Sequence, residues 1–218
     1  MCPGMSTHVA SFRVRYPHRV SVPAGWAGVS REDRRARRRA SIVRAAFDLF
    51  GDGGEAAVTV RSVSRTTGLH HRYFRESFAN TDELLGAVYD EVYTQLRTIL
   101  TAATAGVPGD QARLRAGIGA VLDFSSADAR RGQILFTAAP TNPVLVARRA
   151  HAQQELREYI FRVRDRVGPK HPDQVTAKVA AAIYAGATAE LNQQWLAGSL
   201  GNDLEAVVER AVRLLAPG

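Results

Sequence analysis

The sequence predicts an all-α protein in which an N-terminal three-helix domain with a helix-turn-helix precedes a larger C-terminal helical domain. Apolar residues recur at helical spacing from Arg31 onward, and no later stretch alternates as half-buried strands do. Residues 1–81 hold 14 arginines and 6 acidic residues, whereas residues 82–218 hold 15 basic and 15 acidic residues. We therefore expect three parts, which are a flexible basic arm over 1–30, a helix-turn-helix domain over 31–81 and a helical domain over 82–218.

The composition is that of an ordinary soluble globular protein and excludes several other classes. Apolar residues make up 45% of the 218 residues and charged residues 23%. The single cysteine, Cys2, excludes an intrachain disulfide and a cysteine-based zinc cluster. The charge-free apolar run over 179–189 is far shorter than the roughly 20 residues that span a membrane. Arg13, Arg15 and Arg19 interrupt the N-terminal arm, so we expect no secretory signal and a cytoplasmic location.

The first helix is expected to start at Arg31, after an arm without helical periodicity. The arm has no acidic residue and contains Pro3, Pro17 and Pro23, so it is either flexible or the product of a start codon placed too early. An arginine-rich run then leads into the i, i+3, i+4, i+7 apolar spacing of an amphipathic helix. The glycines over 51–54 are expected to end that helix. Its apolar stripe consists of Ile42, Ala45, Ala46, Leu49 and Phe50.

Two short helices are expected next, over about 59–66 and 70–77. Thr59 is the expected N-cap of the first, because its hydroxyl can accept a hydrogen bond from a backbone N–H of the first turn. Gly68 lies between the two helices, where glycine adopts a positive φ without strain. Short helices joined through a glycine, with longer helices on either side, fit a helix-turn-helix motif.

The remainder of the chain predicts longer helices. Asn80 and Glu83 form a capping box that starts the first of them, and its apolar face runs from Leu84 to Leu100. Helical periodicity continues beyond Gly106 to the end of the chain. Further helices are expected from Pro108 through Leu122 and over about 128–138, 143–166, 173–196 and 202–215.

The second short helix has a polar face available for a nucleic acid. On a helical wheel with Phe74 facing the core, Arg72 and Glu76 lie at about 160° and 200°, flanked by Tyr73 and Arg75 at about 100° on either side. In a major groove, arginine can contact guanine through two hydrogen bonds and glutamate can accept from cytosine N4. The alternative is a solvated helix with an i, i+4 ion pair. The segmental charge and the preceding arginine-rich helix favour DNA.

The same region resembles a known family of DNA-binding proteins. The residues that carry the pattern are Ile42 to Phe50, Gly54, Thr59-Val60, Gly68-Leu69, Phe74, Phe78 and Asp82-Glu83-Leu84-Leu85. They are similar to the N-terminal DNA-binding domain of TetR-family (TetR/AcrR-like) transcriptional regulators, and the spacing matches without a gap from Val58 to Val88. Near the C-terminus, Trp195-Leu196-Ala197-Gly198 followed by an amphipathic helix resembles a common ending of the family.

The resemblance implies which residues contact an operator in double-stranded DNA. Three positions depart from the family pattern: Arg75 stands where tyrosine is usual, Thr81 where lysine is usual and His70 where a small N-capping serine is frequent. We therefore expect an operator preference unlike that of a typical member. The DNA contacts implied by the resemblance are Thr59, Arg61, His71, Arg72, Tyr73, Arg75, Ser77 and Thr81.

The resemblance also implies a homodimer, built mainly through residues 173–215, that reads a palindromic operator with half-sites about 34–36 Å apart. Small residues in the first of these two helices allow close helix approach, whereas the alternative is an ordinary buried helix within one subunit. We expect the regulator to be a repressor rather than an activator. The small residues are Ala177, Ala180, Ala181, Ala185 and Ala189.

A pocket for an unknown small-molecule effector among the middle helices is a further implication of the resemblance. Aromatic side chains are the candidates to contact the effector, although aromatic residues also fill ordinary helical cores. Asn142, Gln133 and His151 are candidate polar contacts. The aromatic candidates are Tyr89, Tyr93, Phe124, Phe136, Tyr159 and Tyr184.

No motif in the sequence indicates an enzyme, a cofactor or a metal site. The chain lacks a P-loop, a dinucleotide-binding glycine motif, an H-E-x-x-H motif and a nucleophile elbow. His70 and His71 diverge by about 100° on a helix and cannot readily share one metal ion. The remaining alternative is a non-specific nucleic-acid-binding helical protein that holds phosphates through the arginines over 31–39.

Overall fold

The computed structural model describes residues 30–137, 142–167 and 174–215, and the predicted arm over 1–30 lies almost wholly outside them. The described residues form helices and no strand, as the sequence predicted. None of these helices combines the length and hydropathy that a bilayer crossing requires. The elements are α1 (Arg31–Gly53), η1 (Glu55–Ala57), α2 (Val60–Thr67), α3 (His71–Ser77), α4 (Thr81–Thr104), α5 (Asp110–Ala127), α6 (Ala129–Gly132), the π-helical turn η2 (Gln133–Thr137), α7 (Pro143–Val167), α8 (Gln174–Leu196) and α9 (Leu204–Leu215).

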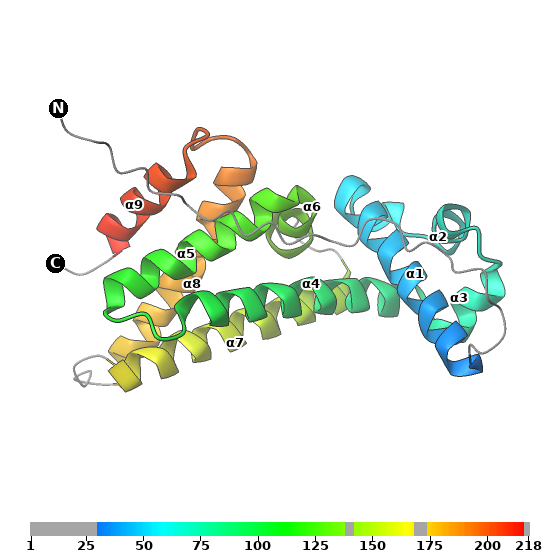
Figure 1. Ribbon diagram of the computed structural model, residues 1–218, viewed down its shortest axis with the longest axis horizontal. Helices are drawn as coiled ribbons and strands as arrows, with labels where there is room; N and C mark the ends of the chain where they lie inside the picture. Colours follow the sequence, from blue (N-terminus) through cyan, green and yellow to red (C-terminus); the bar gives the residue numbers. More distant parts are fainter. Residues whose placement is uncertain (1–29, 138–141, 168–173, 216–218) are drawn as a thin grey trace, which may run out of the picture.

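The elements form an elongated molecule. The helices α1, α2 and α3 gather at one end, and α4 runs from that end into a bundle with α5, α7, α8 and α9 (Figure 1). The short helix α6 packs against both α5 and α1. The long helix α4 thus belongs to both ends of the molecule.

The helix termini follow the local chemistry of their sequences. Thr59 caps α2 by accepting a hydrogen bond from the Ser62 backbone N–H at 3.0 Å. Gly68 ends α2 in the left-handed region, with φ 69°. The side chain of Asn80 accepts from the Glu83 N–H at 2.8 Å, whereas Glu83 reaches the N–H of Ala79 and not that of Asn80. The capping box expected at the start of α4 therefore forms only in part, because its second hydrogen bond comes from the backbone N–H of Ala79, one residue before the N-cap.

The glycines near the end of α1 have different roles, since Gly51 serves packing and Gly54 serves termination. The helix continues through Gly51 to Gly53, and Gly54, whose φ is 73°, is its C-cap. A Cβ on Gly51 would lie 2.3 Å from the Cβ of Arg130 in α6. Glycine at this position therefore lets α6 approach the last turns of α1, a role that the sequence pattern does not reveal.

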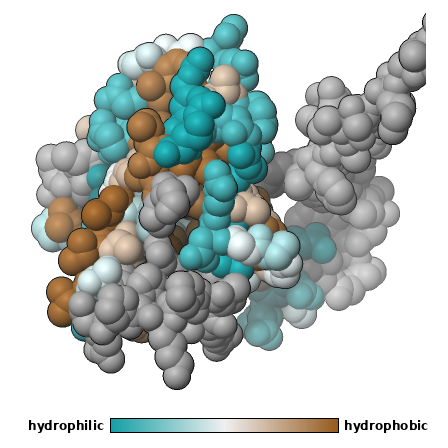
Figure 2. Space-filling model, turned by 90° about the vertical axis from the view of Figure 1, so that its left-hand side faces the viewer, coloured by the Kyte–Doolittle hydropathy of each residue, from teal (hydrophilic) through white to brown (hydrophobic). Residues whose placement is uncertain are grey.

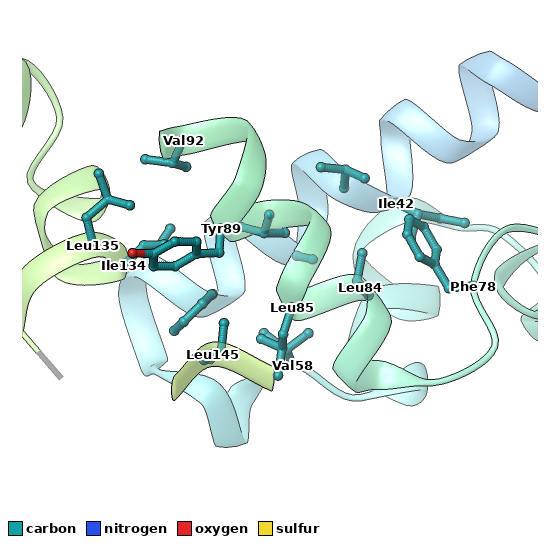
Figure 3. Close-up of a cluster of buried hydrophobic side chains, with 14 of the residues drawn as sticks. Ile42, Val58, Phe78, Leu84, Leu85, Tyr89, Val92, Ile134, Leu135 and Leu145 are labelled. Carbon is teal, nitrogen blue, oxygen red and sulfur yellow. The ribbon is translucent and has the colours of Figure 1, made fainter. Parts of the chain in front are cut away.

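One continuous hydrophobic core joins the two ends of the molecule along α4 (Figure 3). Ile42 of α1 and Phe78 lie near Leu84 of α4. Further along α4, Tyr89 lies beside Leu135 of the η2 turn. No linker separates the helix-turn-helix from the bundle, because α4 begins at Thr81, three residues after the buried Phe78. A second cluster joins α5, α8 and α9 through Ile118, Leu122, Leu191, Val207, Val208 and Val212.

Polar contacts also connect α6 and α7 to the N-terminal helices. Arg130 donates to Asp128 and to Asp48 of α1, each at 2.9 Å. The hydrogen bond with Arg130 holds the pKa of Asp128 below its ordinary value. Asn142 accepts from the Val144 N–H at 2.9 Å at the start of α7 and donates to Asp82 at 2.7 Å. These contacts fix the orientation of α6 and α7 relative to α1 and α4.

Replacing Asn192 with leucine is expected to raise the free energy of unfolding by about 1–3 kcal/mol. Asn192 of α8 is fully buried, and neither polar atom of its side chain meets a hydrogen-bond partner among the described residues. Leucine has a similar shape and removes the cost of burying an unsatisfied amide. The midpoint of urea denaturation measures the change. The exposed Asn202→Leu variant should show no such gain, and a loss of stability in Asn192→Leu would mean that the amide is hydrogen-bonded after all.

Candidate nucleic-acid interface and internal cavities

The helix α3 buries one face and exposes the opposite one. Phe74 and Phe78 are 3% and 2% exposed, and their ring centroids lie 6.0 Å apart against the core. Arg72, Arg75 and Glu76 point outward, on the face that the helical wheel predicted. His71, Arg72, Arg75 and Glu76 are exposed, and Tyr73 and Ser77 are half-buried.

The N-terminus of α3 is capped by a histidine. The Nδ1 of His70 accepts a hydrogen bond from the backbone N–H of Arg72 at 3.3 Å. His70 thus performs the capping role for which a small serine is more usual. His71 follows it with its ring centroid 4.0 Å from that of His70. The departure at this position therefore preserves the start of the helix and leaves the His71 side chain exposed.

Two arginines of α1 hold α3 in place. Arg35 donates to the backbone carbonyl of Glu76 in the last turn of α3 at 2.9 Å. Arg38 lies 3.7 Å from the Glu76 carboxylate and 4.6 Å from the centre of the Tyr73 ring. Part of the arginine-rich run therefore contacts α3 directly and supports it. Other arginines of α1, among them Arg31, Arg34 and Arg37, are exposed at the same end of the molecule.

Arg72 is oriented by its neighbour in the sequence. Its guanidinium lies 4.6 Å from the Tyr73 ring centre and donates to the Tyr73 hydroxyl at 2.7 Å. This hydrogen bond raises the pKa of Arg72 above its ordinary value. Arg72 engages Tyr73, and Glu76 engages Arg38, so the structure differs from the i, i+4 pair of the solvated-helix alternative. The Arg72 guanidinium is thus already ordered on the exposed face of α3.

The other predicted DNA contacts flank α3. Thr59 and Arg61 are exposed at the start of α2, and Thr81 is half-buried at the first position of α4. Arg65 of α2, which was not among the predicted contacts, is exposed as well. The structure thus places cationic and hydroxyl side chains on two consecutive short helices and at the N-terminus of a third, where backbone N–H groups favour phosphate.

The helical bundle encloses two adjoining cavities. The larger, of about 640 Å³, lies between α4, α7, α8 and the η2 turn, and the smaller, of about 260 Å³, lies between α4, α5, α7 and α8. The volume of the larger cavity is typical of pockets for organic ligands, which are concave and largely apolar. The two cavities share the lining residues Leu100, Val121, Leu156, Tyr159 and Thr188.

Most of the predicted aromatic contacts line these cavities. Tyr89, Tyr93 and Phe136 line the larger, Tyr184 lines the smaller and Tyr159 lines both. Burial raises the pKa of the Tyr89 and Tyr93 hydroxyls, and for Tyr93 a hydrogen bond with Glu155 adds to the effect. Phe124 is buried beneath Arg131 and lines neither cavity. The three polar candidates also lie elsewhere: Gln133 and His151 are exposed, and Asn142 caps α7.

Charged residues that were not predicted from the sequence line the larger cavity. Most belong to α7, whose alternation of charged and apolar residues looks like an ordinary solvated helix. Only the packing of α4, α7 and α8 shows that one part of this face borders a cavity. The residues are Arg97, Arg149, Glu155, Arg157, Glu158 and Arg162. The described residues contain no cluster of side chains suited to bind a metal ion.

The helix α8 carries an exposed apolar stripe. Val175, Val179 and Ile183 recur every four residues and are 69%, 52% and 56% exposed. Figure 2 views the molecule from the end opposite the helix-turn-helix and shows hydrophobic residues along the left-hand side of the described surface. Among the small residues predicted for an interface, Ala181 and Ala185 are instead buried within the same protomer. The stripe is therefore distinct from the alanines predicted for the interface.

Part of the chain is similar in sequence to known transcriptional regulators. No family model matches the chain. The HTH-type transcriptional repressor Rv3405c of Mycobacterium tuberculosis is 36% identical over 61 residues, which are 28% of this chain. The match spans only about a third, 32%, of the length of that relative.

Two solved structures extend the comparison to the whole fold. A TetR-like transcriptional regulator from Rhodococcus sp. RHA1 superimposes with a TM-score of 0.67 at 16% identity, over 83% of this chain and 94% of that one. The transcriptional regulator FadR from Bacillus subtilis, solved in complex with stearoyl-CoA, gives a TM-score of 0.67 at 15% identity, over 82% and 98% of the two chains. The chain thus has the fold of TetR-like transcriptional regulators, as the resemblance in the sequence implied.

Proposed function

We propose that the protein is a ligand-responsive transcriptional regulator that binds a specific operator in double-stranded DNA as a homodimer. The ordered outward face of α3 is the observation that carries the proposal. Arg72, Tyr73 and Arg75 occupy that face, and Arg35 and Arg38 of α1 hold the helix through contacts with Glu76 and Tyr73. An arginine ordered before binding loses less conformational entropy when it contacts a base. In this proposal, residues 31–81 bind DNA and residues 82–218 bind the effector and the second subunit.

The dimer in this proposal forms through α8 and α9. The exposed stripe of Val175, Val179 and Ile183 gives α8 a surface that a second copy can cover, and Leu214 of α9 is 85% exposed. An interface with twofold symmetry pairs the same patch on both subunits. Two copies of α3 would then read half-sites about 34–36 Å apart in a near-palindrome.

The effector in this proposal binds within the bundle. The two cavities lie between α4, α5, α7 and α8, and α4 is continuous with the core of the helix-turn-helix. A ligand that favours one arrangement of α4 shifts the population of dimers able to bind the operator. The relative named a repressor and the neighbour solved with stearoyl-CoA support repression and an organic effector.

The experiment that tests the proposal is selection of bound duplexes from a random DNA pool at about 0.15 M salt. We expect one near-palindrome to be enriched, with strong preference over unrelated duplexes. The alternative, a non-specific binder that uses the arginines over 31–39, predicts no enrichment and an affinity that falls uniformly with salt. If no sequence is enriched, whether or not a small-molecule extract is added to the selection, the proposal is overturned.

Replacing single arginines is expected to separate base contacts from phosphate contacts. Arg72→Ala should cost about 1–3 kcal/mol at one base pair of the operator and relax specificity there. Arg61→Ala and Arg75→Ala should weaken binding evenly across sequences and reduce the salt slope by about one each. Affinities for the operator and its single-base variants, measured over a range of salt, test both roles. Unchanged base preference in Arg72→Ala would contradict its assignment.

A further inference from the structure

We propose that the two cavities form one bipartite site for an amphipathic anion. Its charged head lies among the arginines of the larger cavity, and its unbranched apolar tail passes Tyr159 into the smaller cavity. The inference rests on the effector-binding role proposed above and names the chemical class of the effector. A long-chain carboxylate and its thioester with a phosphorylated carrier share this chemistry.

The larger cavity carries an excess of positive charge. Arg97 lies 4.0 Å from the Glu155 carboxylate, and Arg162 lies 3.8 Å from that of Glu158. Arg149 and Arg157 add two more guanidinium groups to the lining, so four arginines face two glutamates. Guanidinium groups bind carboxylate and phosphate through paired, charge-assisted hydrogen bonds. The side chains of Arg97 and Arg162 are more than half exposed, so the cationic part of the cavity borders solvent.

The smaller cavity has the opposite character. Its wall is mainly apolar, with Leu114, Ile118 and Ile160 among the residues that line it. Its two charged lining residues, Asp110 and Arg113, form an ion pair with each other at 3.1 Å and add no net charge. A cavity of this kind gains free energy by taking up methylene groups and little by taking up a charge.

At the boundary between the cavities, the hydroxyls of Tyr159 and Thr104 already have hydrogen-bond partners. The Thr104 hydroxyl donates to the Leu100 carbonyl at 2.8 Å, and Tyr159 therefore donates its short hydrogen bond to Thr104. Since both hydroxyls are occupied, the ring of Tyr159 presents apolar surface to each cavity. A tail without polar groups can pass Tyr159 without breaking a hydrogen bond of either hydroxyl.

An amphipathic cation is the rival ligand. Tyr89, Tyr93 and Phe136 line the larger cavity and could contact a cation through their ring faces, beside the carboxylate of Glu155. The four arginines oppose this, because bringing a cation into their partly buried field is unfavourable. The structure therefore favours an anionic head.

The test is calorimetric titration of the purified full chain, without DNA, with straight-chain ligands that differ in head and length. The probes are carboxylates of about eight to eighteen carbons, the coenzyme A thioesters of the same chains, the matching alcohols and the matching alkyltrimethylammonium ions. We expect the anions to bind, with affinity rising about fourfold for each added methylene until the smaller cavity is full. The carboxylate and thioester series identify which source of the anion is preferred. Tighter binding of the alcohols or the cations would overturn the proposal.

Gly117 offers a variant that blocks only the tail. A Cβ at this position would lie 3.6 Å from Leu100 and 3.7 Å from Thr104, which is ordinary contact distance, so Gly117→Ala is a matched control for folding. Gly117→Leu should fill part of the smaller cavity and lower the affinity for the longest ligands at least about tenfold, while the affinity for the shortest ligands stays the same. Equal loss at all lengths, or no loss at any length, would show that the tail does not enter the smaller cavity.

Arg149 and its neighbour provide a matched pair of variants for the head. Arg149→Gln should weaken the carboxylates about tenfold and leave the alcohols unchanged. Arg148→Gln is the control, because Arg148 pairs with Asp90 at 2.9 Å and lines neither cavity. Equal effects of the two variants would overturn the role of the arginine lining. All these readouts are independent of DNA, so failure to find an operator leaves the binding test intact, and failure of ligand binding leaves the operator test intact.

Discussion

Phe78→Ala is expected to lower the free energy of unfolding by about 3–5 kcal/mol, which approaches the whole stability of many domains. Phe78 is 2% exposed and lies where the helix-turn-helix meets α4. Its ring packs against Phe74 and under the guanidinium of Arg39, at 4.8 Å from the ring centre. Removing it leaves a cavity between elements that cannot easily collapse, because α1 and α4 are both long and rigid.

Urea denaturation followed by circular dichroism measures this loss, and DNA binding should fall with it. The control is Ile99→Ala, which shortens a partly exposed apolar residue of α4. We expect less than about 1 kcal/mol from that control. A similarly small effect of Phe78→Ala would mean that the two ends of the molecule are packed less tightly than the structure shows.

Ile183→Glu is expected to convert the proposed dimer into monomers and to lower operator affinity at least about 100-fold. The twofold axis of such an interface brings the two copies of a residue near its centre close together. Two glutamates would then be buried without partners, at a cost of several kcal/mol. Each monomer would bind one half-site only, so the gain from simultaneous binding of both half-sites would disappear.

Sedimentation velocity at micromolar concentration measures the oligomeric state, and titration with the selected operator measures affinity. Val146→Glu is the matched control, because Val146 is a half-exposed apolar residue on α7, away from the α8 stripe. The control should remain dimeric and bind the operator normally. A dimer in both variants would place the interface elsewhere on the molecule.

The positions of the helices were predictable because their ends depend on local chemistry. Thr59, Gly68 and Asn80 each act within a few residues of their own position, and the structure shows all three in the predicted roles. Apolar periodicity likewise fixed the buried face of α3, since Phe74 and Phe78 are one turn apart. The prediction of residues 128–138 as one short helix was less exact, because Gln133–Thr137 forms a π-helical turn instead.

The remaining features depend on contacts between distant segments. Gly51 looks like a helix terminator until Arg130, far along the chain, is placed against it. Arg38 looks like a phosphate contact until Tyr73 and Glu76 are placed beside it. In the same way, alanine spacing in α8 cannot distinguish the face turned toward its own protomer from the face turned outward. Sequence periodicity reports that a face is apolar, but not which neighbour covers it.

The continuous core along α4 has a consequence for engineering hybrid regulators. Exchanging effector domains by a cut at residue 81 would separate Phe78 from Leu84, although both belong to one buried cluster. Such a chimera would present unmatched apolar surfaces at the junction and would be prone to aggregate. A cut in the exposed turn after Thr104, which transfers α4 together with the helix-turn-helix, keeps that part of the cluster intact. In this fold the exchangeable unit is therefore longer than the DNA-binding motif itself.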